Sequence, residues 1–226
     1  MMLKRRQANE FAARPPHTEM NIYDRYILPP LTHCACGSAL LARQRAAVVP
    51  NARGDVLEIG IGSALNLDFY DASRIGSLTG IDPSRQLLAM AHRRSRHAAF
   101  PVRLVPAVAE NLPFPDASMD SIVVTFSLCS IPDVAAALRE MRRVLKPGGP
   151  LLFCEHGLAP DAGVQLWQQR LDPLWGKLAG GCHLTRDIPR LLGDGHFRCN
   201  DLAAAYLRTA PRFAGYIYRG SATAQP

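Results

Sequence analysis

The chain has 226 residues and a formal net charge of +7; 48% of its residues are hydrophobic and 20% are charged. This length suits one α/β domain with a sizeable core and is too short for two comfortable domains. No apolar run approaches the ~18 residues that span a bilayer, and no apolar stretch follows the basic residues at the start, which argues against a signal peptide. We therefore expect a cytoplasmic globular protein.

Basic charge gathers near the N-terminus, where residues 1–53 hold eight Lys or Arg against three acidic residues, a difference of +5. A second basic cluster occupies residues 92–97. No aromatic residues alternate with these cations, as a base-stacking surface would require. We expect no nucleic-acid partner and at most a weak contact with an anionic membrane surface.

Six cysteines are scattered along the chain without a Cys-x-x-Cys pair, so free thiols are expected rather than a disulfide framework. His33-Cys34-x-Cys36 has the look of half a zinc site, but no second half follows at the spacing that zinc sites use. The sequence therefore predicts no metal site.

Residues 1–20 are polar, basic and broken by Pro15-Pro16, which predicts a flexible tail. The rest of the chain, 21–226, reads as one domain. Its first part, 21–50, should form N-terminal cap helices: an amphipathic run over 22–28, interrupted by Pro29-Pro30, and a second helix over about 37–49.

The segment 51–155 alternates apolar strands with helices and should form the cofactor-binding core. Strands are expected near 55–59, 77–81, 102–106, 120–126 and 150–155, with two final strands, 199–206 and 213–219, in the last segment, 197–226. Apolar residues at 134, 138, 141 and 145 give the intervening helix one buried stripe. The pattern predicts a Rossmann-like α/β fold: a mostly parallel seven-stranded sheet with helices on both faces.

Residues 156–196 are not needed by such a core and are expected to form a helical lid over the substrate. Trp167 and Trp175 are eight residues apart and would lie near one helical face if Pro173 only bends the helix.

The stretch 55–66 carries the strongest chemical signal. A short apolar strand ends in Glu58, and the chain turns through Gly60 and Gly62, which permit close approach of the backbone to a ligand. Asp82 closes a second strand, where a carboxylate can accept two hydrogen bonds from a ribose diol. The pattern predicts a nucleotide-like cofactor, and the stretch has no Walker lysine for a phosphate.

The spacing of Glu58, Gly60, Gly62 and Ala64 resembles motif I of the class I S-adenosylmethionine (SAM) methyltransferases, which usually have glycine where Ala64 stands. The segments 109–116, 120–126 and 145–149 resemble later parts of that family in the same order. The resemblance implies SAM as cofactor and S-adenosylhomocysteine as product.

The resemblance also implies a set of cofactor contacts. Many relatives carry an acid at the position of Val108, so here Glu110 or a backbone carbonyl would bind the adenine amine. The expected contacts are Glu58, Gly60, Gly62, Asn66, Asp82, Pro83, Ala109, Glu110 and Ser127.

A narrower resemblance rests on four segments: 55–70, 126–130, the pair Glu155-His156, and the stretch from Trp167 to Arg186. Together they look like the small-thiol methyltransferases related to the animal methyltransferase-like proteins. This resemblance implies methylation of a small thiol or of hydrogen sulfide.

His156, at the end of the fifth strand, is the best-placed general base, although a histidine satisfied within the core is an equal reading. The residues expected to contact the acceptor are Tyr26, Cys129, Trp167, Trp175 and His183; for Cys129 and the tryptophans, packing is the competing interpretation.

Three alternatives stay open for the reaction. The acceptor could be a quinone, a phenol or a lipid amine instead of a thiol. The chain could also bind SAM without turnover. The third alternative is RNA methylation, for which the sequence shows no added RNA-binding domain. The sequence carries no signal for an oligomeric state.

Overall fold

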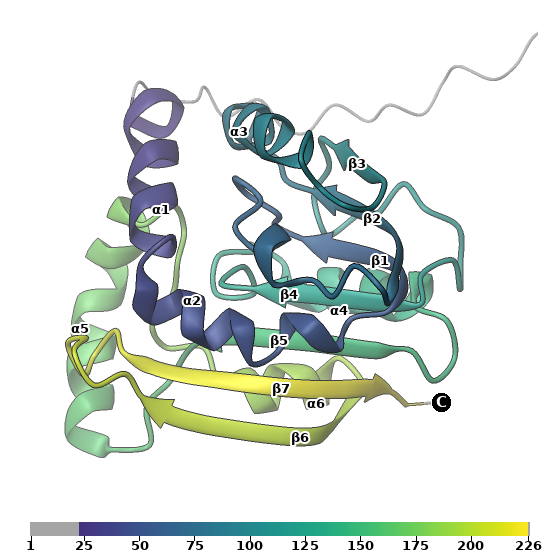
Figure 1. Cartoon of the computed structure of the whole chain (residues 1–226). Coiled ribbons are helices and arrows are strands. Elements are labelled where there is room, and N and C mark those ends of the chain that lie inside the picture. Colours follow the sequence, from purple (N-terminus) through teal and green to yellow (C-terminus); the bar gives the residue numbers. More distant parts are fainter. Residues whose placement is uncertain (1–22, 226) are drawn as a thin grey trace, which may run out of the picture.

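A computed structural model describes residues 23–225 of the chain, apart from the side chains of residues 24 and 25 (Figure 1). The predicted tail, 1–20, lies outside the described residues. In the described part, no helix is both long and apolar enough to cross a membrane.

One seven-stranded sheet forms the centre of the molecule, as predicted. Its strands are β1 (Gly54–Ile59), β2 (Ile75–Ile81), β3 (Val102–Val105), β4 (Ser121–Thr125), β5 (Pro150–His156), β6 (Phe197–Tyr206) and β7 (Tyr216–Ala224). Their spatial order is β3-β2-β1-β4-β5-β7-β6. Only β7 is antiparallel to its neighbours, β5 and β6. The order reverses at β1, so the carboxyl ends of β1 and β4 flank the crevice where such sheets bind ligands.

Six α-helices accompany the sheet: α1 (Leu28–Cys36), α2 (Ala39–Ala46), α3 (Arg85–Ser95), α4 (Val134–Val144), α5 (Ala162–Leu178) and α6 (Ile188–Asp194). Three single turns complete the described elements: a π-helical turn, Tyr23–Ile27, and two 3₁₀ turns, Val49–Asn51 and Leu67–Phe69.

Two separate hydrophobic clusters show that both faces of the sheet are covered. Helices α4 and α6 pack on one face, through residues such as Leu138 and Leu192. Helix α3 and the turn at Val49 pack on the other face, where Leu88 is buried. The stripe predicted for α4 is confirmed by the burial of Leu138 and Met141. Because the central strands are buried on both faces, they read as continuous apolar runs.

The N-terminal helices differ from the prediction at the two prolines. Pro29 and Pro30 stand in the first turn of α1 and do not interrupt a helix, because the first turn of a helix needs no backbone N–H donor. The helix expected over about 37–49 is shorter, Ala39–Ala46, and a separate 3₁₀ turn follows it.

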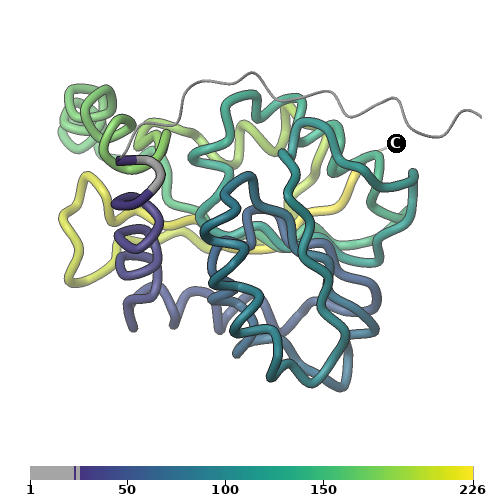
Figure 2. Tube along the Cα trace, turned by 90° about the horizontal axis from the view of Figure 1, so that it is seen from above, coloured from purple at the N-terminus to yellow at the C-terminus, as the bar shows by residue number. Residues whose placement is uncertain are grey.

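Helix α5 runs through Pro173 without ending, as the prediction required. It stands beside α1 at one end of the sheet (Figures 1 and 2), and the Tyr23 hydroxyl donates a hydrogen bond to the Leu178 carbonyl at 2.6 Å. The segment expected as a lid therefore contacts the N-terminal helices.

The last strand begins three residues later than predicted and runs on to Ala224. Residues 211–215 form turns instead, closed by the hydrogen bond from the Ala214 N–H to the Pro211 carbonyl at 3.0 Å. Phe213 consequently lies in the loop between β6 and β7, where its ring meets Trp175 edge to face.

Candidate active site

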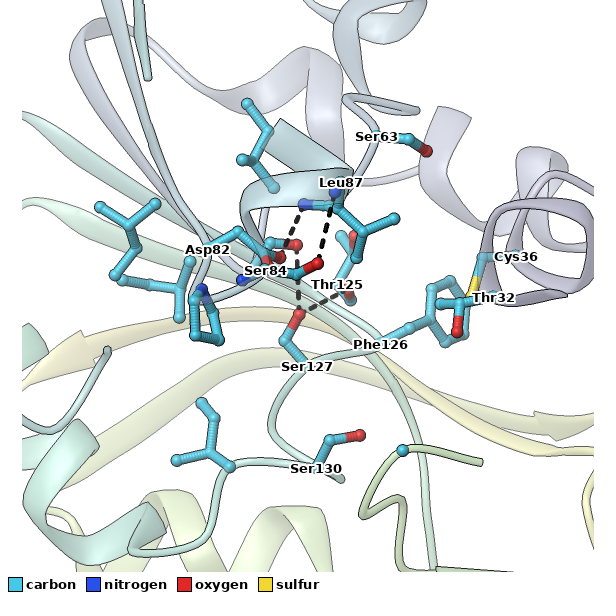
Figure 3. A pocket seen from close by; sticks show the side chains of 18 of the residues that line it. Thr32, Cys36, Ser63, Asp82, Ser84, Leu87, Thr125, Phe126, Ser127 and Ser130 are labelled. Atoms are coloured by element: carbon cyan, nitrogen blue, oxygen red, sulfur yellow. Dashed lines mark hydrogen bonds between the residues drawn. The ribbon is translucent and has the colours of Figure 1, made fainter. Parts of the chain in front are cut away.

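A cavity of about 520 Å³ opens at the carboxyl ends of β1, β2, β3 and β4. One wall, which we call the β1–β2 side, consists of residues 58–66 and 81–84. The opposite wall, the α1 side, consists of five residues of α1 (Leu28, Pro29, Thr32, His33, Cys36), residues 130–132 and residues 179–180. Figure 3 shows Asp82 and Ser84 of the first wall facing Thr32 and Cys36 of the second. This volume suits one small organic ligand.

The turn after β1 has the conformation that its glycines permit. Gly60 has φ +65° and Gly62 has φ +55°. A Cβ on Gly60 would lie 2.2 Å from Ser127 Oγ, so the close approach of the two loops requires glycine. Ala64, which replaces the family's usual glycine, adopts φ +61°, a region that costs an L-residue about 1–2 kcal/mol. The turn therefore keeps the glycine-type geometry despite the substitution.

Glu58 is buried beneath this turn and both of its oxygens are already hydrogen-bonded. Asn66 Nδ2 donates to one oxygen at 2.9 Å, and the Tyr70 hydroxyl donates to the other at 2.7 Å. Burial raises the pKa of Glu58 to about 7, although the hydrogen bonds from Tyr70 and Asn66 act in the opposite direction. Glu58 thus shapes the turn from below as well as lining the cavity.

Asp82 presents its carboxylate at the end of β2. The Gly62 N–H donates to one oxygen at 3.0 Å, and the Ser84 N–H donates to the other at 2.8 Å. Each oxygen keeps a second lone pair, so the group can also accept two hydroxyl donors. Burial raises the pKa of Asp82 to about 6, while its two backbone hydrogen bonds oppose the shift.

The loop after β3 contributes residues 107–110 to the cavity. Ala109 and Glu110 are both part of this lining, and Glu110 Oε1 also accepts a hydrogen bond from the Asp133 N–H at 3.4 Å. All nine residues expected to bind the cofactor line the same cavity: Glu58, Gly60, Gly62, Asn66, Asp82, Pro83, Ala109, Glu110 and Ser127.

The loop after β4, residues 126–131, crosses from one wall of the cavity to the other. The buried Glu155 carboxylate accepts hydrogen bonds from the N–H groups of Ser127 and Leu128, at 2.8 and 3.0 Å. From the other direction, the Arg186 guanidinium donates to the carbonyls of Leu128 and Ile131. Two charged groups therefore fix the position of this loop. Phe126, at its start, has φ +53°, which is unusual for a bulky residue.

None of the five residues expected to contact the acceptor lies among the residues that line the cavity. Tyr26 and Trp167 are 63% and 57% exposed. Trp175 packs against Phe213, and His183 Nδ1 lies 2.8 Å from Asp172 Oδ2. Cys129 is part of the loop after β4, but its side chain is buried and does not line the cavity. The wall opposite the β1–β2 side is formed in part by α1, and α5 contributes no residue to it.

His156 also lies outside the lining of the cavity. Its Nε2 atom lies 2.6 Å from Cys182 Sγ, so that ring nitrogen is already engaged. Burial opposes the charged form, but the contact with Cys182 and the nearby Glu155 favour it, and the net effect raises the pKa of His156. The structure therefore does not bring this histidine to the position that a base acting in the cavity would need.

Two basic residues of the cavity were not expected from the sequence. His33 lines the α1 side, and its Nδ1 atom lies 2.6 Å from Ser63 Oγ. Arg45 is 4% exposed, donates to the Cys36 carbonyl at 2.6 Å and holds its guanidinium 4.8 Å from the Phe126 ring centre. An arginine and a histidine in cap helices carry no spacing signal, and only their burial beside the cavity distinguishes them.

Comparison with known proteins agrees with this geometry. Residues 57–153 match the family model described as a methyltransferase domain. The chain thus carries a class I SAM-dependent methyltransferase domain, and SAM is the cofactor of that domain.

Two curated relatives are thiol S-methyltransferases. The chain is 38% identical to TMT1A of Homo sapiens over 153 residues, which cover 66% of this chain and 62% of that protein. It is also 38% identical to TMT1B of Rattus norvegicus over 137 residues, covering 58% and 55%. The matched region therefore spans little more than half of these relatives. The chain is also 36% identical to a phosphatidylethanolamine N-methyltransferase of Cereibacter sphaeroides. That match covers 54% of this chain and 60% of that protein.

A solved SAM-dependent methyltransferase from Methanosarcina mazei superimposes with a TM-score of 0.60 and 23% identity, covering 76% of this chain and 93% of that one. The [4+2]-cyclase SpnF superimposes with a TM-score of 0.64 and 20% identity, covering 82% and 80%. Similarities at this level show the fold, and the second one illustrates that the fold alone does not fix the reaction.

Proposed function

We propose that the protein transfers the methyl group of SAM to a small thiol or to hydrogen sulfide. The observation that carries the proposal is the α1 side of the cavity, which is largely apolar and contains one imidazole, that of His33. Its other polar side chains are the small hydroxyl and thiol groups of Thr32, Cys36 and Ser130. A thiol is acidic enough to react with this little assistance, whereas a carbon acid needs a stronger base. The two thiol S-methyltransferases at 38% identity support the same acceptor class.

The cofactor's ribose would be held by Asp82, whose carboxylate is aligned by two backbone N–H groups. Two buried polar atoms among the described residues of the cavity have no hydrogen-bond partner: Asn66 Oδ1 and Arg45 Nε. An amino-acid tail carries an ammonium donor and a carboxylate acceptor, which complement these two atoms. The polar residues present thus fit SAM.

SAM supplies an activated methyl group on its sulfonium. The task of the protein is to hold the acceptor sulfur in line with that methyl and to exclude water. Correct orientation alone can lower the activation barrier by several kcal/mol. In our proposal, His33 Nε2, which Ser63 does not use, takes the proton of the thiol as the new carbon–sulfur bond forms and the methyl–sulfonium bond breaks. The electron pair of the broken bond stays on the departing thioether, S-adenosylhomocysteine.

The test is product formation from labelled SAM with five acceptors: hydrogen sulfide, a small alkyl thiol, a catechol, a demethylated quinone and phosphatidylethanolamine. Turnover of the thiols alone is the expected result. Turnover of the lipid amine or the quinone alone would replace the thiol proposal. These acceptors belong in the panel because the relatives include the phosphatidylethanolamine N-methyltransferase and a demethylmenaquinone methyltransferase of Staphylococcus haemolyticus.

The role of His33 is tested with a series of thiols of different acidity. His33→Ala should lower kcat/KM most for the least acidic thiol and least for a thiol that is already ionised. The matched control is His92→Ala, because His92 is exposed on α3, away from the cavity. An equal loss for all thiols would show that His33 shapes the wall and takes no proton.

A further inference from the structure

Three side chains with soft or borderline donor atoms meet behind the loop after β4. They are Cys129 in that loop, His156 at the end of β5, and Cys182 in the segment between α5 and α6. Their ligand atoms all lie within 4.8 Å of one another. The two sulfurs are 3.5 Å apart, and His156 Nε2 is 2.6 Å from Cys182 Sγ. The methyl-transfer scheme above uses none of these atoms.

The donor set selects a class of ligand. Two thiols and one imidazole are typical donors for zinc and other thiophilic cations, whereas magnesium and calcium prefer oxygen. Tetrahedral zinc, with Zn–S of about 2.3 Å and Zn–N of about 2.0–2.1 Å, sets the two sulfurs about 3.8 Å apart and nitrogen and sulfur about 3.6 Å apart. The sulfur pair already has nearly this separation. The imidazole must withdraw from Cys182 by about 1 Å, which side-chain rotation can supply.

We propose that Cys129, His156 and Cys182 bind one thiophilic divalent cation of the zinc type. Three protein ligands leave a fourth coordination position for water or an exogenous ligand. The cation would join the loop after β4, the end of β5 and the segment before α6, which are far apart in the sequence. The proposal is independent of the identity of the methyl acceptor.

Hydrogen bonds around the cluster hold its backbone in place. The His183 N–H donates to the Cys129 carbonyl at 2.8 Å, which ties the segment carrying Cys182 to the loop carrying Cys129. The Cys129 N–H in turn points to Glu155 Oε2 at 3.4 Å, beside His156. Outer contacts of this kind orient metal ligands and are a usual part of a binding site. Cys129 and Cys182 are 1% and 9% exposed, so the two sulfurs are shielded from solvent, whereas His156 is half-buried.

The sequence alone could not show this cluster. Its members stand at positions 129, 156 and 182, and their spacing matches no zinc motif. The pattern that did attract attention, His33-Cys34-x-Cys36, is different in the structure: His33 and Cys36 line the cavity, while Cys34 is exposed. The fold, not the local spacing, therefore makes the candidate metal site.

The direct test is titration of the reduced, metal-free protein with Co²⁺ followed by Zn²⁺. The expected result is one equivalent of Co²⁺ with a sulfur-to-metal charge-transfer absorption, which Zn²⁺ then abolishes by displacement. Cys129→Ser and Cys182→Ser should each weaken the affinity at least tenfold and reduce the absorption. Cys199→Ser is the matched control, since Cys199 lies on β6 outside the cluster, and it should bind like the unmodified protein.

SAM binding, measured by calorimetry on every variant, reports whether the variant is folded. A protein that binds SAM but shows no thiolate absorption with Co²⁺ overturns the metal proposal, and so does an absorption that survives both cluster substitutions. Neither outcome touches the proposed methyl transfer, because the readout is the metal spectrum and not turnover. A second readout is thermal unfolding: Zn²⁺ should raise the Tm of the unmodified protein and of Cys199→Ser, but not that of Cys182→Ser.

Discussion

The two walls of the cavity are built in different ways. On the β1–β2 side, the groups come from two short segments, 58–66 and 81–84, each at the end of one strand. On the α1 side they come from α1, the loop after β4 and the segment after α5, which only meet in the folded chain. The first wall is a local motif repeated over adjacent strands, while the second wall depends on long-range contacts.

This difference has a physical consequence. Asp82 is aligned by backbone N–H groups at positions 62 and 84, which the sheet itself positions. The loop after β4 instead depends on two side chains, Glu155 and Arg186, that reach it from other elements. We expect damage to the first wall to act on cofactor affinity, and damage to the second to act on acceptor use.

The largest expected effect comes from Asp82→Ala. Removing a buried carboxylate that accepts charge-assisted hydrogen bonds should cost about 2–3 kcal/mol, or roughly 30–150-fold in the Kd for SAM. Calorimetric titration measures the change. Asp71→Ala is the control, because Asp71 is exposed and outside the cavity. A Kd within threefold of the unmodified protein would remove Asp82 from the binding site.

Arg186→Ala tests the second wall. It frees the carbonyls of Leu128 and Ile131, and the loop should then hold the acceptor less accurately, with a roughly 10–100-fold loss in kcat/KM. The Kd for SAM should change by less than about threefold. Arg190→Ala is the control, since Arg190 is exposed on α6. A larger loss of SAM affinity than of acceptor turnover would show that the two walls are not independent.

Acid should weaken the first wall through Asp82, whose pKa burial raises to about 6. The ionised carboxylate accepts the ribose hydroxyls, so affinity is complete above this pKa and falls as the pH drops through it. At about pH 5 the Kd for SAM should be about tenfold weaker than at about pH 7.5. Asp82→Asn, which cannot ionise, should lose this dependence. A variant as pH-sensitive as the unmodified protein would assign the titration to another group.

The smallest expected effect is that of Trp167→Ala. Its side chain is 57% exposed and does not line the cavity, so stability should change by less than about 0.5 kcal/mol and turnover should be unaffected. Denaturant unfolding and the acceptor assay provide both numbers. Trp175→Ala is the contrast, because that ring packs on Phe213, and it should be clearly destabilising. A strong loss of turnover in Trp167→Ala would return α5 to the role of a substrate lid.

Much of the fold and one wall of the site could be predicted. The strand and helix order, the antiparallel exception aside, follows from alternating apolar runs, and all nine expected cofactor residues reach one cavity. The five residues expected to contact the acceptor do not line that cavity. Trp167 and Trp175 were conspicuous in the sequence, yet one faces solvent and the other packs against a loop.

What the sequence by itself determined is the part set by local rules: glycines where the chain must turn with positive φ, acids at strand ends, and apolar periods of strands and helices. What only the tertiary structure decided is which distant side chains meet. His33 and Arg45 enter the cavity, and Cys129, His156 and Cys182 form one cluster, because helices and loops pack at one end of the sheet. These long-range contacts depend on how whole helices and loops pack, so the spacing of residues along the sequence does not predict them.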